Sequence, residues 1–170
     1  VVGLDCFTDY YPRAQKEKNA ADVKAAGASM LPLDLAADDL GSALEGVEAV
    51  YHLAAQPGIS ASTPFESYLQ NNIVATHRLL EACLENASLE LFVNVATSSV
   101  YGFRATDPET APPRPVSHYG ATKLAAEAMT MGYHESGRFP ATSFRLFSVY
   151  GPRERPEKLF PRLIESILSG

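Results

Sequence analysis

Short apolar segments alternate with amphipathic segments along this chain. The apolar segments are expected to be strands, at residues 1–5, 29–35, 49–55, 89–95 and 141–146. The other segments are expected to be helices, at residues 17–27, 36–46, 65–86, 119–136 and 159–169. The helix at 65–86 is expected to bury Leu69, Ile73, Leu79, Leu80 and Cys83. Because strands alternating with helices form parallel sheets covered on both faces, the prediction is an α/β protein with a doubly wound parallel sheet.

The residues at the carboxyl ends of the predicted strands point to a ligand site. They are Asp5, Asp34, Ala54, Ala55, Thr97, Phe147 and Ser148. The carboxyl ends of parallel strands meet at one edge of the sheet, and ligands of open α/β sheets lie beyond that edge. The sequence therefore predicts a site built from the ends of several strands.

Composition narrows the class of protein. The 170 residues suffice for one domain with its own core, and 46% of them are hydrophobic. The net charge of −6 argues against a nucleic-acid partner, because phosphate binding needs a basic surface. No apolar run approaches the ~18 residues of a membrane span, so no membrane partner is expected and the protein is predicted to be cytoplasmic. The two cysteines, Cys6 and Cys83, are expected to be buried thiols, and the histidines show no metal-ligand spacing.

One segment carries side chains suited to acid–base chemistry. Tyr119 and Lys123 are four residues apart in a predicted helix, so they share a face. A free tyrosine has a pKa of about 10, and a neighbouring cation favours its phenolate form. Thr97 begins a Thr-Ser-Ser sequence after an earlier strand and offers a hydroxyl for a proton relay. The set suits removal of a proton from an alcohol while hydride leaves, although the tyrosine–lysine spacing alone also fits a solvated helix face.

Several segments, in order, resemble the extended short-chain dehydrogenase/reductases. They lie at residues 3–5 with 9–11, 52–58, 72–76 with 79–82, 96–102, 119–123 and 145–152. Within that group the chain resembles the NAD-dependent nucleotide-sugar epimerase/dehydratase family. The resemblance implies one Rossmann-like NAD-binding domain over residues 1–170, incomplete in this chain. A glycine-rich loop is expected before Val1 and a substrate-binding region after Gly170.

The resemblance implies NAD as the cofactor. Asp5 would accept hydrogen bonds from the adenosine ribose, and its carboxylate would repel the 2′-phosphate of NADP. Alternatively, Asp5 is a turn residue and Asp34 caps the next helix. Asn72 would brace the strand ends near the cofactor. The residues implied in cofactor binding are Asp5, Asp34, Leu35, Leu53, Ala54, Ala55, Gln56, Asn72, Tyr119, Lys123 and Phe147.

The same resemblance implies the catalytic roles. Tyr119 would be the base, Lys123 would hold the nicotinamide ribose and tune Tyr119, and Thr97 would bind the sugar O4. Substrate contacts are implied for Thr97, Ser98, Tyr119, Ser148 and Arg153. A solvated basic turn is the alternative for Arg153.

Among subgroups, the chain most resembles the UDP-glucuronate 4-epimerases. This implies inversion at C4 of a UDP sugar through a transient 4-keto intermediate. Ser98 and Ser99 stand where dehydratases carry an Asp-Glu pair, so a dehydratase is disfavoured. A UDP-glucuronate decarboxylase, a 4-keto-sugar reductase and a non-catalytic nucleotide-binding protein remain open. The family also implies a homodimer through the helices at 65–86 and 119–136.

Overall fold

The computed structural model describes residues 1–58 and 62–169. It forms two compact units. The larger unit comprises Leu33–Phe147, and the smaller unit combines Val1–Pro32 with Ser148–Gly170.

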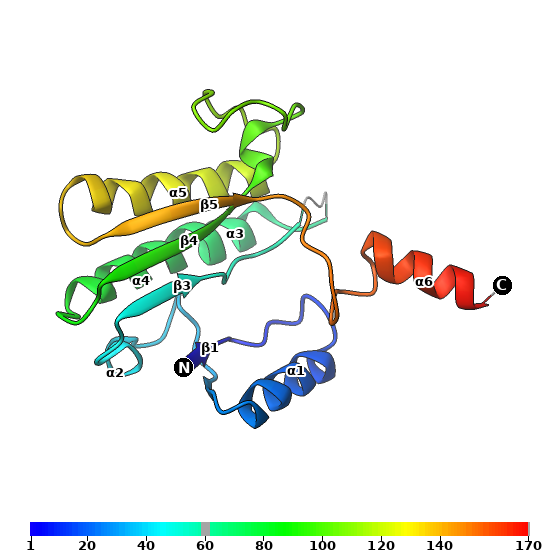
Figure 1. Cartoon of the computed structure of the whole chain (residues 1–170), viewed down its shortest axis with the longest axis horizontal. Helices are drawn as coiled ribbons and strands as arrows, with labels where there is room; N and C mark the ends of the chain where they lie inside the picture. Colours follow the sequence, from blue (N-terminus) through cyan, green and yellow to red (C-terminus); the bar gives the residue numbers. More distant parts are fainter. Residues whose placement is uncertain (59–61, 170) are drawn as a thin grey trace. The chain divides into compact units, whose positions relative to one another are not determined.

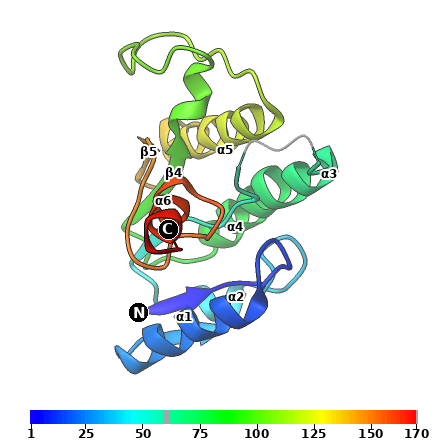
Figure 2. The same ribbon diagram turned by 90° about the vertical axis from the view of Figure 1, so that its right-hand side faces the viewer.

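The larger unit is built on a parallel sheet in the order β3 (Ala49–His52), β4 (Leu91–Thr97) and β5 (Ala141–Leu146). Two helices, α4 (Ala75–Leu84) and α5 (His118–Glu135), lie side by side on one face of this sheet (Figures 1 and 2). Parallel strands joined by crossover helices confirm the predicted α/β, Rossmann-like class.

The smaller unit contains β1 (Val2–Leu4), α1 (Arg13–Ala25), β2 (Ser29–Leu31) and α6 (Leu159–Ser169). β1 and β2 pair in parallel as a separate two-stranded sheet. The two parts of this unit are joined by the ion pair between Arg153 and Asp22, at 3.3 Å.

The core of the larger unit lies between the sheet and its helices. α4 buries Leu79, Leu80 and Cys83, as the periodicity predicts. Phe92 of β4 is fully buried, with its ring centroid 5.9 Å from that of Phe139. Burial of each large apolar side chain contributes about 1.5–3 kcal/mol, so this layer fixes the helices on the sheet.

The predicted helix at 65–86 is one helical run with a π-helical segment inside it. α3 (Phe65–Tyr68) leads into the π-helical η1 (Leu69–Val74), which continues as α4. A π turn holds more residues than an α turn and therefore rotates the buried stripe. As a result, Leu69 is 38% exposed, contrary to the prediction, whereas Tyr68 and Asn72 are each 1% exposed.

Other boundaries also differ from the prediction. α1 begins at Arg13 rather than at residue 17. The helix expected at 36–46 is confined to α2 (Gly41–Leu44), because a turn precedes it. In that turn Asp34 Oδ1 accepts a bond from Ala36 N at 2.8 Å. Such side-chain bonds compete with helix formation.

One of the two cysteines is exposed, contrary to the prediction. Cys83 is buried, and burial raises the pKa of its thiol to about 12. Cys6 is exposed and lies two residues beyond the end of the short strand β1. The expectation of two buried thiols is therefore wrong for Cys6.

Asn72 joins three segments of the larger unit. Its Oδ1 accepts a bond from Gln56 N at 2.7 Å, just beyond β3. Its Nδ2 donates to Thr122 Oγ1 of α5 at 3.0 Å and to Gln56 O at 3.3 Å. The amide thus holds the end of β3 against α5, which is the bracing role expected for Asn72.

Gly120 allows α5 to approach the short 3₁₀ helix η2 (Ser98–Tyr101) that follows β4. A Cβ on Gly120 would lie 2.7 Å from Ser99 O and 3.2 Å from the Cβ of Pro115. A carbon cannot occupy that position without displacing backbone, so the start of α5 requires glycine here.

We expect Gly120→Ala to lower the free energy of unfolding by about 1–3 kcal/mol, as overpacked sites do. Gly132→Ala in the same helix is the matched control, because a Cβ there would meet nothing within 4 Å. Its better helix propensity should raise the free energy of unfolding by about 1 kcal/mol. Urea denaturation of the full-length protein measures both, and shifts of the same sign would contradict the close approach.

We expect Asn72→Ala to lower the free energy of unfolding by about 1–3 kcal/mol, because Gln56 N would be left unpaired in the interior. Asn71→Ala is the control, since the Asn71 side chain bonds only within its own helical run, to Ser67 O at 2.9 Å. A loss no larger for Asn72→Ala than for Asn71→Ala would show that the brace carries little stability.

Candidate active site

The tyrosine–lysine pair lies at the start of α5. Ser117 caps the helix by accepting a bond from Gly120 N at 3.0 Å. Tyr119 is half-buried, with its ring centroid 6.5 Å from that of Tyr68. Lys123, one turn further on, is only 3% exposed. The buried position of Lys123 contradicts the alternative of a solvated helix face.

The hydroxyl cluster lies at the carboxyl end of β4. Thr97 is 8% exposed and caps η2 by accepting a bond from Ser99 N at 3.2 Å. Its Oγ1 also lies 3.3 Å from Ser99 Oγ. Because Gly120 packs on Ser99 O, this turn adjoins the start of α5. The structure therefore brings the segment of Thr97 and Ser98 next to the segment of Tyr119.

The buried charge of Lys123 affects the pKa values of the groups beneath α5. Burial lowers the pKa of Lys123 to about 8, and the carboxylate of Glu127 acts in the opposite direction. His52, at the end of β3, is 2% exposed. Burial, with the charge of Lys123, lowers the pKa of His52 to about 3, so its imidazole is neutral. Lys123 thus has an uncharged neighbour on the sheet side.

The tautomer of His52 follows from its hydrogen bonds. Thr76 Oγ1 donates its one proton to Asn72 O at 2.7 Å. It must therefore accept a proton from His52 Nε2, 2.8 Å away. The chain His52–Thr76–Asn72–Thr122 links β3 to α5 through buried polar groups. The sequence analysis assigned no role to His52 and Thr76, because their hydrogen bond joins residues that are 24 positions apart.

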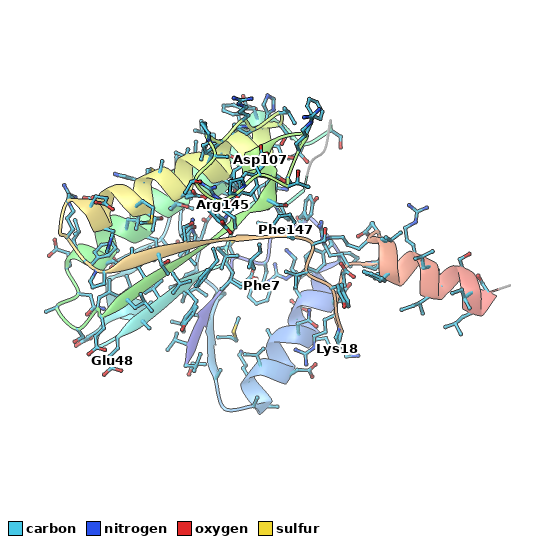
Figure 3. All side chains as sticks on the ribbon, turned by 45° about the horizontal axis from the view of Figure 1, so that its top comes forward. Phe7, Lys18, Glu48, Asp107, Arg145 and Phe147 are labelled. Carbon is cyan, nitrogen blue, oxygen red and sulfur yellow. The ribbon has the colours of Figure 1, made fainter. Side chains whose placement is uncertain are left out.

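A buried ion pair lies one turn beyond Lys123. Glu127 of α5 pairs with Arg145 of β5, and the shortest of three contacts is 2.6 Å, between Arg145 Nη2 and Glu127 Oε1. Figure 3 shows Arg145 on the strand, toward α5. Arg145 Nη1 also donates to Glu109 O at 3.1 Å, and its guanidinium lies 5.0 Å from the Tyr101 ring centroid. The hydrogen bonds that Arg145 donates to Glu127 raise the pKa of Arg145. The only sequence signal for this pair was the spacing of Glu127 from Lys123.

The residues expected to bind the adenosine part of NAD belong to different units of the structure. In the smaller unit, Asp5 follows β1, is exposed, and accepts a bond from Phe7 N through Oδ1 at 2.7 Å. In the larger unit, Asp34 is half-buried in the turn already described, and Leu35 is 8% exposed. Both aspartates therefore serve as turn residues.

The segment that follows β3 carries the small side chains of Ala54 and Ala55 and the amide of Gln56. Leu53 and Ala54 are exposed, Ala55 is half-buried and Gln56 is 8% exposed. The Nε2 of Gln56 is buried and has no hydrogen-bond partner among the residues that the structure describes. An unpaired buried donor is costly, and a ligand that accepts from it would remove the cost.

At the end of β5, Phe147 and Ser148 are exposed. Arg153, in the following loop of the smaller unit, pairs with Asp22 and adopts a positive φ of 71°. Arg153 therefore lies in an exposed turn, as the alternative expected, and is also paired with Asp22.

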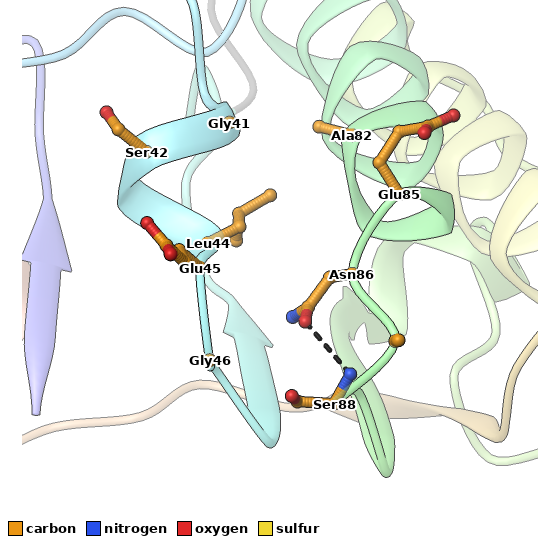
Figure 4. A pocket seen from close by; sticks show the side chains of 10 residues that line it. Gly41, Ser42, Leu44, Glu45, Gly46, Ala82, Glu85, Asn86 and Ser88 are labelled. Atoms are coloured by element: carbon orange, nitrogen blue, oxygen red, sulfur yellow. Dashed lines mark hydrogen bonds between the residues drawn. The ribbon is translucent and has the colours of Figure 1, made fainter.

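One surface pocket lies at the opposite edge of the sheet. It has a volume of about 380 Å³ between α2 and the end of α4, and Gly46, Asn86 and Ser88 are among its lining residues (Figure 4). These residues precede β3 and β4, whereas Thr97 follows β4. The pocket is therefore separate from the candidate site. In residues 1–58 and 62–169 no cluster of metal-ligating side chains is present and no helix is long and apolar enough to span a membrane.

Comparisons with known proteins agree with this geometry. The NAD dependent epimerase/dehydratase family model matches residues 3–170. The crystal structure of UDP-glucuronic acid 4-epimerase from Bacillus cereus, in complex with UDP-glucuronic acid and NAD, is 39% identical with a TM-score of 0.91. That match covers 99% of this chain and 55% of the Bacillus cereus chain.

Two curated relatives extend the comparison. The uncharacterized UDP-glucose epimerase YtcB of Bacillus subtilis is 41% identical over 172 residues, which are 99% of this chain and 54% of YtcB. The trifunctional UDP-glucose 4,6-dehydratase/UDP-4-keto-6-deoxy-D-glucose 3,5-epimerase/UDP-4-keto-L-rhamnose-reductase RHM2 of Arabidopsis thaliana is 37% identical over 147 residues, 81% of this chain and 22% of RHM2. The chain thus spans about half the length of YtcB and a smaller part of RHM2. Since the family model matches nearly all of its residues, the chain belongs to the NAD dependent epimerase/dehydratase family.

Proposed function

We propose that the full-length protein is an NAD-dependent 4-epimerase of a UDP sugar such as UDP-glucuronate. The observation that carries this proposal is the placement of the Tyr119–Lys123 helix against the hydroxyl turn of Thr97. This arrangement joins a phenol, a buried ammonium and a hydroxyl at the carboxyl end of a central strand. The relatives with epimerase names support the same reaction.

The residues present fit NAD as the cofactor. Gln56 offers an unpaired buried donor beyond β3, where Ala54 and Ala55 leave room for a diphosphate to approach the backbone. Asp5 offers a carboxylate oxygen that a ribose hydroxyl can use, and such a carboxylate disfavours NADP. Roles in binding the cofactor are also proposed for Leu53, which follows β3, for Phe147, which follows β5, and for Asn72 of η1, which holds the end of β3. When bound, the cofactor supplies the acceptor for a substrate hydride.

The residues of this chain account for the proton movements. Tyr119 as phenolate removes the proton from the sugar O4, and Thr97 binds or relays it. The charge of Lys123 stabilises the phenolate and the developing alkoxide. Turning of the 4-keto sugar before hydride returns would invert C4 alone. Ser98, Ser148 and Arg153 are proposed to contact the substrate, and for Arg153 this contact would replace its pairing with Asp22.

Two features of the hydroxyl turn favour epimerisation over dehydration. Elimination of water needs an acid and a base beside the sugar, and Ser98 and Ser99 are poor at both tasks. The hydroxyl of Ser99 is in addition engaged by Thr97 Oγ1, at 3.3 Å. The decarboxylase and the reductase share the Thr97, Tyr119 and Lys123 chemistry, so product analysis must distinguish them.

We also propose a homodimer through helices 65–86 and 119–136. Phe65, Leu69 and Leu84 are 42%, 38% and 37% exposed on the first of these helices. A partner helix that covered them would bury apolar surface, which stabilises association.

We expect Tyr119→Phe to reduce kcat by several orders of magnitude while the protein remains folded, because the base is lost and the ring is retained. Tyr133→Phe is a control, because Tyr133 lies near the other end of α5 and its phenol donates to Glu81 of α4. Steady-state rates with UDP-glucuronate measure the effect, and near-normal turnover of Tyr119→Phe would refute the assignment of the base.

We expect the wild-type protein to convert UDP-glucuronate into its C4 epimer with no release of CO₂ and no net change in NADH. Chromatography of the nucleotide sugars, a CO₂ assay and the absorbance of NADH at 340 nm separate the candidates. Release of CO₂ would identify a decarboxylase. Net oxidation of NADH with a 4-keto substrate would identify a reductase, and the absence of turnover with bound nucleotide would identify a binding protein.

A further inference from the structure

Lys123 lies in a setting that favours loss of its proton. Its side chain is almost completely removed from water, and an enclosed ammonium is more costly than an enclosed amine. A neutral Lys123 would no longer favour the phenolate of Tyr119. Some feature of the fold must therefore offset the burial of this cation.

Charged groups reach Lys123 from few directions. On the sheet side, β3 presents His52, which is neutral. On α5, Tyr119 precedes Lys123 by one turn and Glu127 follows it by one turn. Within the described part of the chain, Glu127 is the carboxylate whose charge acts on Lys123.

Glu127 cannot move freely toward Lys123, because Arg145 holds it. Both carboxylate oxygens accept bonds from Arg145 Nε, at 3.0 and 3.1 Å, and Oε1 accepts another from Nη2. The two side chains are 11% and 15% exposed. Arg145 is in turn fixed by Glu109 O. The carboxylate is thus kept at a set position on the stripe that Tyr119, Lys123 and Glu127 share.

We propose that Glu127 is a positioning residue that keeps the Lys123 ammonium protonated beside Tyr119, and that Arg145, by holding the same carboxylate, limits the charge that it offers to Lys123. The arrangement is asymmetric, because Glu127 shares the helix face of Lys123 while Arg145 reaches Glu127 from β5. Loss of the carboxylate and loss of the guanidinium should therefore affect Lys123 in opposite directions. A purely structural ion pair would give the same consequence for both losses.

The primary test is a titration that does not depend on turnover. The full-length protein, labelled with ¹³C- and ¹⁵N-lysine and saturated with NAD⁺, is titrated by NMR, and the Lys123 signal is assigned by its absence in Lys123→Met. We expect Glu127→Gln to lower the pKa of Lys123 by about one unit or more. Arg145→Met should leave that pKa unchanged or raise it, because the ionised carboxylate is no longer shared.

Two further variants keep the test decisive. Glu127→Gln/Arg145→Met avoids an unpaired buried charge and should also lower the pKa of Lys123, by less than Glu127→Gln alone. Glu81→Gln removes a carboxylate from the half-exposed pair with Arg138 and should leave Lys123 unchanged. No downward shift in Glu127→Gln and in the double variant, or equal downward shifts in Glu127→Gln and Arg145→Met, would overturn the proposal.

The catalytic consequence rests on the proposed epimerase function. If the pKa of Lys123 falls, Lys123 loses its proton at lower pH. The alkaline limb of the kcat profile should therefore move to lower pH in Glu127→Gln. It should not do so in Arg145→Met. If the wild-type protein shows no turnover, the proposed function fails, whereas the lysine titration still decides the role of Glu127.

Discussion

The buried ammonium of Lys123 is the constraint on which the rest of the site depends. A cation removed from water is costly, and its surroundings must either neutralise or stabilise it. The fold meets this requirement with an uncharged His52 on one side and a carboxylate, Glu127, on the other. His52 is kept neutral partly by the same ammonium, so the charge states of the two groups are coupled.

The buried polar groups around Lys123 also explain why α5 packs closely on the sheet. Thr122 bonds to Asn72, and Asn72 holds the end of β3. Gly120 brings the helix start against Ser99. Removal of these contacts would leave unpaired donors in the interior, which is more costly than the loss of an average hydrogen bond. The position of Tyr119 therefore depends on contacts that lie behind it, away from the ligand.

The sequence was sufficient to predict the order of strands and helices and the helix of Tyr119 and Lys123, because both depend on local periodicity and short spacing. It did not predict the π-helical segment, whose only local effect is a one-residue shift of the buried stripe from Leu69 to Tyr68. It also missed the pairing of Glu127 with Arg145, which are 18 residues apart in sequence and meet only when β5 joins the sheet. For Asp5 and Asp34 the structure shows the turn bonds that the local alternative expected, and their role toward a cofactor stays a prediction.

The division of the chain has a consequence for the order of folding. The larger unit is continuous in sequence, from Leu33 to Phe147, so all of its contacts are available once those residues have been synthesised. The smaller unit combines segments from both ends, and its ion pair joins Asp22 to Arg153, 131 residues later (153 − 22). Contacts between such distant residues close slowly because of the loop entropy. During synthesis, the helix of Tyr119 and Lys123 can therefore settle on its sheet while residues 1–32 still await their partner segment.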